Sequence, residues 1–132
     1  WMRLPAPEGV QAFCDTGHNI GGWRYLGPRL RSLASEGPLT IVAGFVNDKD
    51  VGAIMAEMPR TARYFFVEPS IARARHAIDT AMCAREAGLP PGRVYSGPTS
   101  VKDAFADAIS EAEPGTTVFV GGSTFVVADL LS

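Results

Sequence analysis

The sequence is poor in cysteine, in long apolar runs and in net charge. Its 132 residues include 2 cysteines, Cys14 and Cys83, without CxxC spacing, so we expect reduced thiols and neither a zinc site nor a disulfide framework. No apolar run approaches the roughly 20 residues of a membrane helix, and no signal-peptide pattern opens the chain, which predicts a cytoplasmic protein without a membrane partner. A formal net charge of -2 provides no basic surface for nucleic acid.

The composition is typical of one folded domain. Hydrophobic residues make up 46% of the chain and charged residues 20%, which argues against disorder. At 132 residues the chain can bury a substantial core but is small for an enzyme with several substrates. Because Trp1 is not a natural initiator residue, we expect this domain to have been excised from a longer protein.

Apolar β-rich runs alternate with segments of helical period along the whole chain. This alternation predicts an α/β fold with a mainly parallel sheet that helices cover on both faces. Five strands are expected, at residues 10–14, 39–45, 64–67, 93–95 and 116–120. Five helices are expected to follow them, near residues 20–33, 51–58, 71–87, 101–112 and 124–131.

Two of these helices carry more specific expectations. Pro28 disfavours helical geometry at Gly27, so the first helix is expected either to kink there or to start late. Ser70 can cap the third helix and Gly88 can end it. His76 would lie in the middle of that helix as a surface or packing residue. The apolar positions of the same helix are expected to be Ile71, Ala74, Ile78, Ala81 and Met82.

The first of three polar loops is at residues 15–19, with the sequence DTGHN. In an open parallel sheet, ligands bind beyond the carboxyl ends of the strands, where loops converge and helix N-termini point their donors outward. The Asp15 carboxylate can accept hydrogen bonds from ribose hydroxyls, and the His18 imidazole can donate to phosphate or carboxylate oxygens. The alternative is an ordinary capped turn between strand and helix.

The second loop, NDKD at residues 47–50, places a cation between two carboxylates at a helix start. There Lys49 can hold a substrate carboxylate while Asp50 caps the helix, although a solvated cap would explain the same residues. The third loop, GGS at residues 121–123, has glycines suited to close backbone approach and a helix N-terminus that favours anions. It lacks a Walker A lysine, and Ser123 alone can serve as an N-cap.

Arg73 lies early in the predicted third helix, an unfavourable place for a cation unless an anion is near. An ordinary surface arginine is the commoner explanation. The chain shows no arrangement of nucleophile, base and orienting group and no metal-ligand spacing. We therefore expect neither a catalytic residue nor a metal site within this chain.

Three stretches together resemble the C-terminal domain of folylpolyglutamate and dihydrofolate synthases, members of the Mur ligase superfamily. Residues 14–19 (CDTGHN) resemble the family's Asp-x-x-His-Asn signature, and residues 44–50 (GFVNDKD) its Gly-x-x-x-Asp-Lys-Asp loop. Residues 121–128 (GGSTFVVA) resemble its closing Gly-Ser-x-x-x-Val-Ala element. The stretches occur in the family's order, although residues 19–23 read NIGGW where the family commonly has Asn-Pro-His.

The resemblance implies a Rossmann-like three-layer domain spanning residues 1–132, with the ATP-binding domain lying upstream. By position it implies ATP-binding roles for Asp15, His18 and Asn19. It implies glutamate-side roles for His18, Lys49 and Ser123. Arg73 matches a family arginine whose contact stays unassigned.

The implied reaction is amide formation in folate metabolism. ATP phosphorylates the carboxylate of a folate or dihydropteroate, and the amino group of L-glutamate attacks the resulting acyl phosphate. The upstream domain is expected to hold Mg²⁺ and most of the ATP, so this domain alone is expected to be inactive as a ligase. The resemblance also favours a monomer.

Two other interpretations stay open at the level of sequence. The chain could be a freestanding Rossmann-like module that binds a nucleotide or another anion without catalysis. It could also be a structural interaction domain, in which substitutions at Asp15 or His18 would affect stability alone. The choice between dihydrofolate synthase, folylpolyglutamate synthase and both activities depends on folate-selecting residues that are expected upstream.

Overall fold

A computed structural model of the chain describes residues 1–15, 20–47 and 50–132. The strands form one sheet in the order β1-β2-β6-β3-β4-β5, and every neighbouring pair is parallel except β1 with β2. The strands are β1 Met2–Leu4, β2 Gln11–Cys14, β3 Leu39–Ala43, β4 Arg63–Phe66, β5 Arg93–Val94 and β6 Thr117–Gly121.

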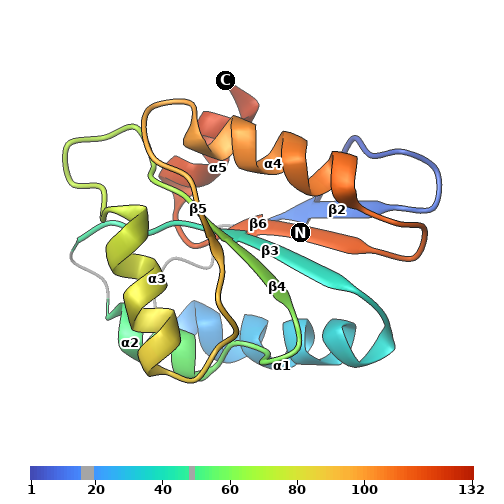
Figure 1. The fold of residues 1–132 in the computed structure, drawn as a ribbon, viewed down its shortest axis with the longest axis horizontal. Coiled ribbons are helices and arrows are strands. Elements are labelled where there is room, and N and C mark those ends of the chain that lie inside the picture. The colour runs from blue at the N-terminus through green and yellow to red at the C-terminus, as the bar shows by residue number, and fades with distance from the viewer. Residues whose placement is uncertain (16–19, 48–49) are drawn as a thin grey trace.

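Helices cover both faces of this sheet. They are α1 Ile20–Glu36, α2 Val51–Ala56, α3 Ala77–Glu86, α4 Ser100–Glu111 and α5 Thr124–Leu131. α4 and α5 lie on one face, and α1, α2 and α3 lie on the other (Figure 1). The predicted three-layer α/β architecture, with a mainly parallel sheet, is confirmed.

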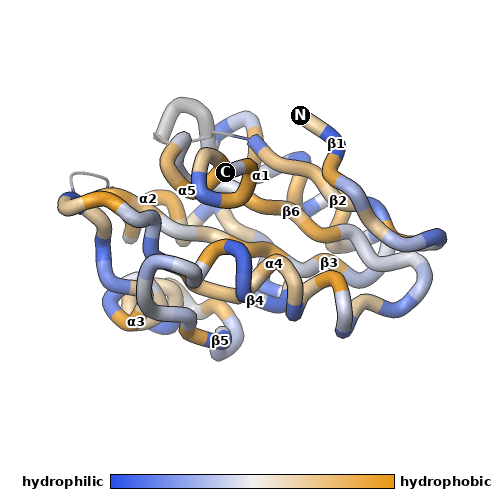
Figure 2. Tube along the Cα trace, turned by 90° about the horizontal axis from the view of Figure 1, so that it is seen from above, coloured by the Kyte–Doolittle hydropathy of each residue, from blue (hydrophilic) through white to orange (hydrophobic). Residues whose placement is uncertain are grey.

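The apolar core is divided into two halves by the sheet. Ile41 and Ala43 of β3 pack toward α1, α2 and α3, whereas Val42 between them packs toward α4 and α5. All five residues of β3 are buried, as expected for a central parallel strand covered on both faces. Figure 2 shows the same pattern, with hydrophobic central strands and most hydrophilic residues in the surrounding loops and helices.

The third helix was predicted too long. α3 begins at Ala77, and the preceding stretch, residues 70–76, is irregular, so Ser70 does not cap a helix and His76 occupies the N-cap position. Ile78 and Met82 are not core residues, because they are 56% and 55% exposed. The buried positions of α3 are Ala77, Thr80 and Ala84.

Hydrogen bonds to another segment explain why residues 70–76 are not helical. The amide of Asn47 donates to the carbonyl of Arg73 at 2.9 Å, and the amide of Arg75 donates to the carbonyl of Phe45 at 2.9 Å. These bonds surround an antiparallel bridge between Val46 and Ala74. Tertiary pairing therefore overrides the helical period of the sequence.

The amino-terminal strand β1 was not predicted. It pairs antiparallel with β2, so that Met2 lies opposite Cys14. Trp1 packs against Phe13 and Phe119, with ring centroids 5.7 and 5.0 Å away, and the Arg29 guanidinium carbon lies 3.8 Å from its ring centre.

The first helix continues through its proline. α1 runs from Ile20 to Glu36 with Pro28 inside, so the alternative of a late start is wrong. None of the helices in the described part of the chain is long and apolar enough to span a bilayer.

Candidate functional site

The carboxyl end of β6 is a topological switch point of the sheet. β6 lies between β2 and β3. The chain leaves β6 for α5 on one face, whereas it leaves β2 and β3 for α1 and α2 on the opposite face (Figure 1). Open α/β sheets bind ligands at such points, because the diverging connections leave a crevice between them.

Backbone contacts hold the three loops together at this point. The amide of Asp15, after β2, donates to the carbonyl of Val120 at 3.1 Å. The amide of Gly44, after β3, donates to the carbonyl of Gly121 at 3.3 Å. A Cβ added to Gly121 would lie 2.8 Å from the carbonyl oxygen of Asp15. The sequence prediction that these loops share one edge of the sheet is therefore confirmed.

Gly122 packs directly on the β3 loop. Its φ of 108° is a conformation that favours glycine, and a Cβ there would overlap the carbonyl oxygen of Gly44. The close approach seen here is to the backbone of Gly44, within the protein, and an approach of these glycines to a bound anion stays a prediction.

Ser123 caps the helix that begins at this site. Its Oγ accepts a hydrogen bond from the amide of Phe125 at 3.1 Å, and the residue is 2% exposed. The N-cap interpretation is confirmed. A role in glutamate binding stays a prediction, and it would have to use the remaining hydrogen-bonding capacity of this hydroxyl.

The second loop is described only in part. Asp50 caps α2 as predicted, with Oδ1 accepting from the amide of Ala53 at 3.1 Å. Lys49 lies outside the described residues, as do His18 and Asn19 of the first loop. Their proposed contacts therefore stay predictions.

Arg73 lies close to the start of α5. Its guanidinium carbon is 6.0 Å from the ring centre of Phe125, the second residue of that helix. The irregular stretch that carries Arg73 joins the loop after β3, through Asn47, to α5. This arrangement was missed because the sequence assigned Arg73 to a helix, and no local pattern indicates the bridge between Val46 and Ala74.

Glu68, after β4, was also missed and proves to be structural. Its side chain is 17% exposed and accepts from the amide of Ala77 at 2.9 Å and the amide of Gly97 at 3.3 Å. His76 Nδ1 lies 3.5 Å away. Burial alone would raise the pKa of Glu68, but these amides and His76 hold it below its usual range. A charged Glu68 thus caps α3 where His76 makes no side-chain cap.

Neither cysteine is placed for metal binding in the described part of the chain, where no group of three or more His, Cys, Asp or Glu gathers. Cys14 and Cys83 are both free. Burial at the end of β2 raises the pKa of the Cys14 thiol, which favours the uncharged form.

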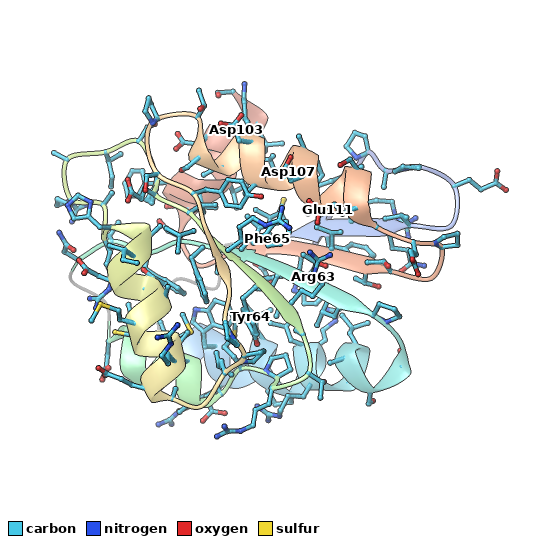
Figure 3. The ribbon with its side chains drawn as sticks, in the orientation of Figure 1. Arg63, Tyr64, Phe65, Asp103, Asp107 and Glu111 are labelled. Carbon is cyan, nitrogen blue, oxygen red and sulfur yellow. The ribbon has the colours of Figure 1, made fainter. Side chains whose placement is uncertain are left out.

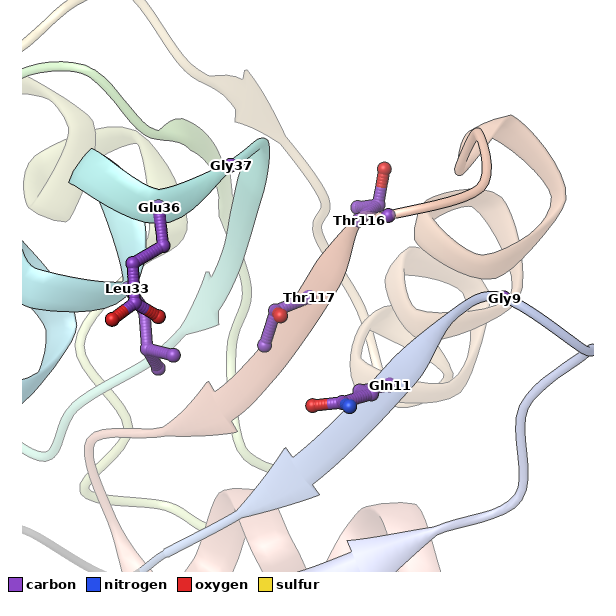
Figure 4. Close-up of a pocket in the computed structure, with 8 residues that line it drawn as sticks. Gly9, Gln11, Leu33, Glu36, Gly37, Thr116 and Thr117 are labelled. Atoms are coloured by element: carbon purple, nitrogen blue, oxygen red, sulfur yellow. The ribbon is translucent and has the colours of Figure 1, made fainter.

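A separate polar pocket opens at the opposite edge of the sheet (Figure 4). Gln11 and Thr117, at the amino ends of β2 and β6, and Glu36, at the end of α1, point toward it. Because β2 and β6 are parallel, this pocket at their amino ends is separated from the switch point at their carboxyl ends by the length of the strands. It does not form part of the candidate site.

A family model described as "Mur ligase, glutamate ligase domain" matches residues 2–124 of the chain. The chain belongs to this Mur ligase family. The resemblance seen in the three sequence motifs is thereby confirmed, and the polar loops at the carboxyl end of β6 are those of a glutamate ligase domain.

Individual relatives of this glutamate ligase domain are much longer than the chain. A "Probable bifunctional folylpolyglutamate synthase/dihydropteroate synthase" of Halobacterium salinarum is 35% identical over 115 residues, which are 87% of this chain and 14% of that protein. The chain thus corresponds to a small part of that relative.

Solved structures show the same fold. E. coli FolC in complex with DHPP and ADP matches with a TM-score of 0.79 and 24% identity, over 97% of this chain and 29% of FolC. A bifunctional folylpolyglutamate synthase/dihydrofolate synthase with Mn, AMPPNP and L-glutamate bound matches with a TM-score of 0.78 and 24% identity, over 97% of this chain and 30% of that protein.

Proposed function

We propose that this chain is the C-terminal lobe of an ATP-dependent folate:L-glutamate amide ligase. The observation that carries the proposal is the meeting of all three family motifs at the carboxyl end of β6, where Asp15 and Gly44 bond to the same strand. The names and bound ligands of the related proteins support the folate and glutamate assignment.

The first loop would contact the nucleotide. The backbone of Asp15 is held at the switch point by the bond from its amide to Val120, and from there its carboxylate would accept from ribose hydroxyls. His18 and Asn19 follow in the same loop and would lie against the nucleotide, with His18 also reaching the glutamate.

The loops after β3 and β6 would contact L-glutamate. Lys49 would pair with one of its carboxylates, and the buried Ser123 hydroxyl would orient the oxygens beside the start of α5. Arg73 is a further cation for phosphate or carboxylate oxygens at this place.

These residues would bind and orient the substrates. ATP would first phosphorylate a folate or dihydropteroate carboxylate, and the amino group of glutamate would then displace phosphate from the acyl phosphate. A lobe preceding this chain would hold Mg²⁺ and most of the ATP. Closure of this lobe over the reactants would bring the glutamate amine to the acyl phosphate, so closure can control the rate.

Glutamate-dependent ADP formation by the complete ligase that carries this domain is the direct test. Asp15→Ala is expected to raise the KM for ATP, and Lys49→Ala the KM for glutamate, each by about tenfold. Glu36→Ala, at the opposite edge of the sheet, is the matched control and should leave both values unchanged.

Three results would contradict the proposal. The first is the absence of glutamate-dependent turnover by the complete protein, and if nucleotide still binds residues 1–132 in that case, the freestanding binding module would be favoured. The second is ligase turnover by residues 1–132 alone. The third is a change in stability alone in Asp15→Ala, which would indicate a structural domain.

A further inference from the structure

Two residues of α5 contact the irregular stretch that carries Arg73. Asp129 Oδ2 accepts from the amide of Ser70 at 2.7 Å, and Asp129 Oδ1 accepts from the Ser70 hydroxyl at 2.7 Å. Phe125 lies under Arg73, with 6.0 Å from the guanidinium carbon to the ring centre. Asp129 and Phe125 are four residues apart, so they share one face of α5.

The bond to Asp129 is the stronger of the two attachments. Two short hydrogen bonds to a charged acceptor are stronger than neutral ones, and they fix both the position and the orientation of Ser70. A distance of 6.0 Å between Arg73 and Phe125 is at the outer limit of a cation–π contact. Of these two contacts between the stretch and α5, the pair with Asp129 is therefore the stronger restraint.

The other end of the same stretch is attached elsewhere. The carbonyl of Arg73 accepts from the amide of Asn47, in the loop that continues to Lys49. Without the Ser70–Asp129 pair, residues 70–73 would remain fastened to the loop after β3 but would lose their hydrogen bonds to α5. The distance between Arg73 and the helix that Ser123 caps would then have one restraint fewer.

We propose that Asp129 is a positioning residue of the ligase, acting through Ser70 to hold the Arg73 guanidinium beside the start of α5. There Arg73 binds anionic oxygens of a substrate, either ATP phosphate or glutamate carboxylate. Asp129 itself touches no substrate. This inference rests on the proposed function, because it assigns substrate binding to the same switch point.

Steady-state kinetics of the complete ligase test the inference. Asp129→Ala is expected to raise the KM of one anionic substrate about tenfold and to leave kcat within about twofold, because a misplaced Arg73 weakens binding in ground and transition state alike. Varying ATP and glutamate separately identifies the source of the oxygens. A rise in the KM for ATP indicates phosphate, and a rise in the KM for glutamate indicates carboxylate.

A double-mutant cycle separates positioning from general loss of structure. If Asp129 acts through Arg73, the variant carrying both Asp129→Ala and Arg73→Ala should have the same KM as Arg73→Ala alone. Ser70→Thr, which retains the hydroxyl, should keep the wild-type KM. The inference would be overturned if the rise in KM of the double variant equalled the product of the two single rises. It would also be overturned if Asp129→Ala left the KM unchanged.

Asp103→Ala is the matched control. Asp103 also accepts one short bond from a hydroxyl, that of Thr99 at 2.7 Å, but within the first turn of α4. If Asp129→Ala does not fold, Asp129→Leu supplies the same comparison, since it removes both acceptor oxygens and leaves a side chain of similar size. An inactive wild-type ligase would contradict both the proposed function and the inference, whereas an active wild type with a wild-type KM in Asp129→Ala or its substitute Asp129→Leu would contradict the inference alone.

Discussion

Gly122 and Gly44 lie backbone against backbone where β6 turns into α5. A side chain on Gly122 would overlap the carbonyl oxygen of Gly44, and the φ of Gly122 is 108°. A side chain at Gly122 would therefore destabilise the domain in two ways, through a strained backbone conformation and through a steric overlap.

Gly122→Ala is expected to destabilise the domain by more than conformational strain alone. Strain at positive φ costs about 1–3 kcal/mol, and the overlap with Gly44 should add about 1–3 kcal/mol. Gly97→Ala is the control, because Gly97 has a φ of 95° with nothing within 4 Å of an added Cβ. Urea unfolding of both variants measures the difference, and equal losses would contradict the overlap.

Ser123→Ala is expected to lower the free energy of unfolding by about 1 kcal/mol, because the amide of Phe125 loses its acceptor. Ser123→Gly should cost only a few tenths of a kcal/mol, since glycine is tolerated at N-caps. Ser110→Ala, on α4, is the control and should stay within about 0.5 kcal/mol of the wild type. A larger loss for Ser123→Gly than for Ser123→Ala would show that the hydroxyl is not acting as a cap.

Glu68→Gln is expected to cost about 1–2 kcal/mol at pH 7, since Ala77 and Gly97 donate to a charged carboxylate. The pKa of Glu68 is lowered in the folded state, so its stabilisation is fully present above the unfolded pKa of about 4.3. It is lost as the pH falls through the lower folded pKa.

Unfolding measured between pH 3 and 7 tests this expectation. The stability difference between wild type and Glu68→Gln should shrink as the pH is lowered. Glu86→Gln, on an exposed position of α3, is the control and should show no such dependence. A constant difference over this range would mean that the charge of Glu68 contributes nothing.

Glu111 is expected to titrate with a pKa of about 2 in the folded domain. Hydrogen bonds from Arg93 at 2.6 and 2.8 Å, and from Arg63 at 2.9 Å, stabilise its carboxylate. In Figure 3 Arg63 and Glu111 lie near Phe65 beside α4. The guanidinium carbons of Arg63 and Arg93 are 5.3 and 4.6 Å from the Phe65 ring centre.

Carbon-13 NMR of the side-chain carboxyl group measures this pKa directly. Arg93→Gln should raise it more than Arg63→Gln, because Arg93 makes two of the three bonds. High salt should also raise it, since the network is exposed to solvent. An identical shift in both variants would contradict the assigned order.

Residues whose structure depends on local contacts were predictable from sequence. Ser123 and Asp50 were identified as caps, because N-cap residues bond to amides two or three positions ahead. The extent of α5, Thr124–Leu131, agreed with the prediction for the same reason. The shared edge of the three loops followed from the alternation of strands and helices, which fixes the direction of a parallel sheet.

Residues whose structure depends on distant partners were not predictable. Ile71, Ala74 and Ile78 have helical spacing, but the backbone around Ala74 pairs with Val46 instead. Ser70 has the chemistry of a helix cap, but its amide and hydroxyl both bond to Asp129, which is 59 positions away in the sequence. The three-residue strand β1 has no recognisable pattern of its own and forms only because β2 offers an edge.

The antiparallel direction of β1 decides where a probe can be attached to this domain. Because Met2 pairs with Cys14, a fluorophore or affinity tag placed before β1 would lie beside the carboxyl end of β2, from which the proposed nucleotide loop continues. Ser132 is one helix length from the switch point, about 12 Å along α5. Binding measurements should therefore immobilise or label this domain through its carboxyl end.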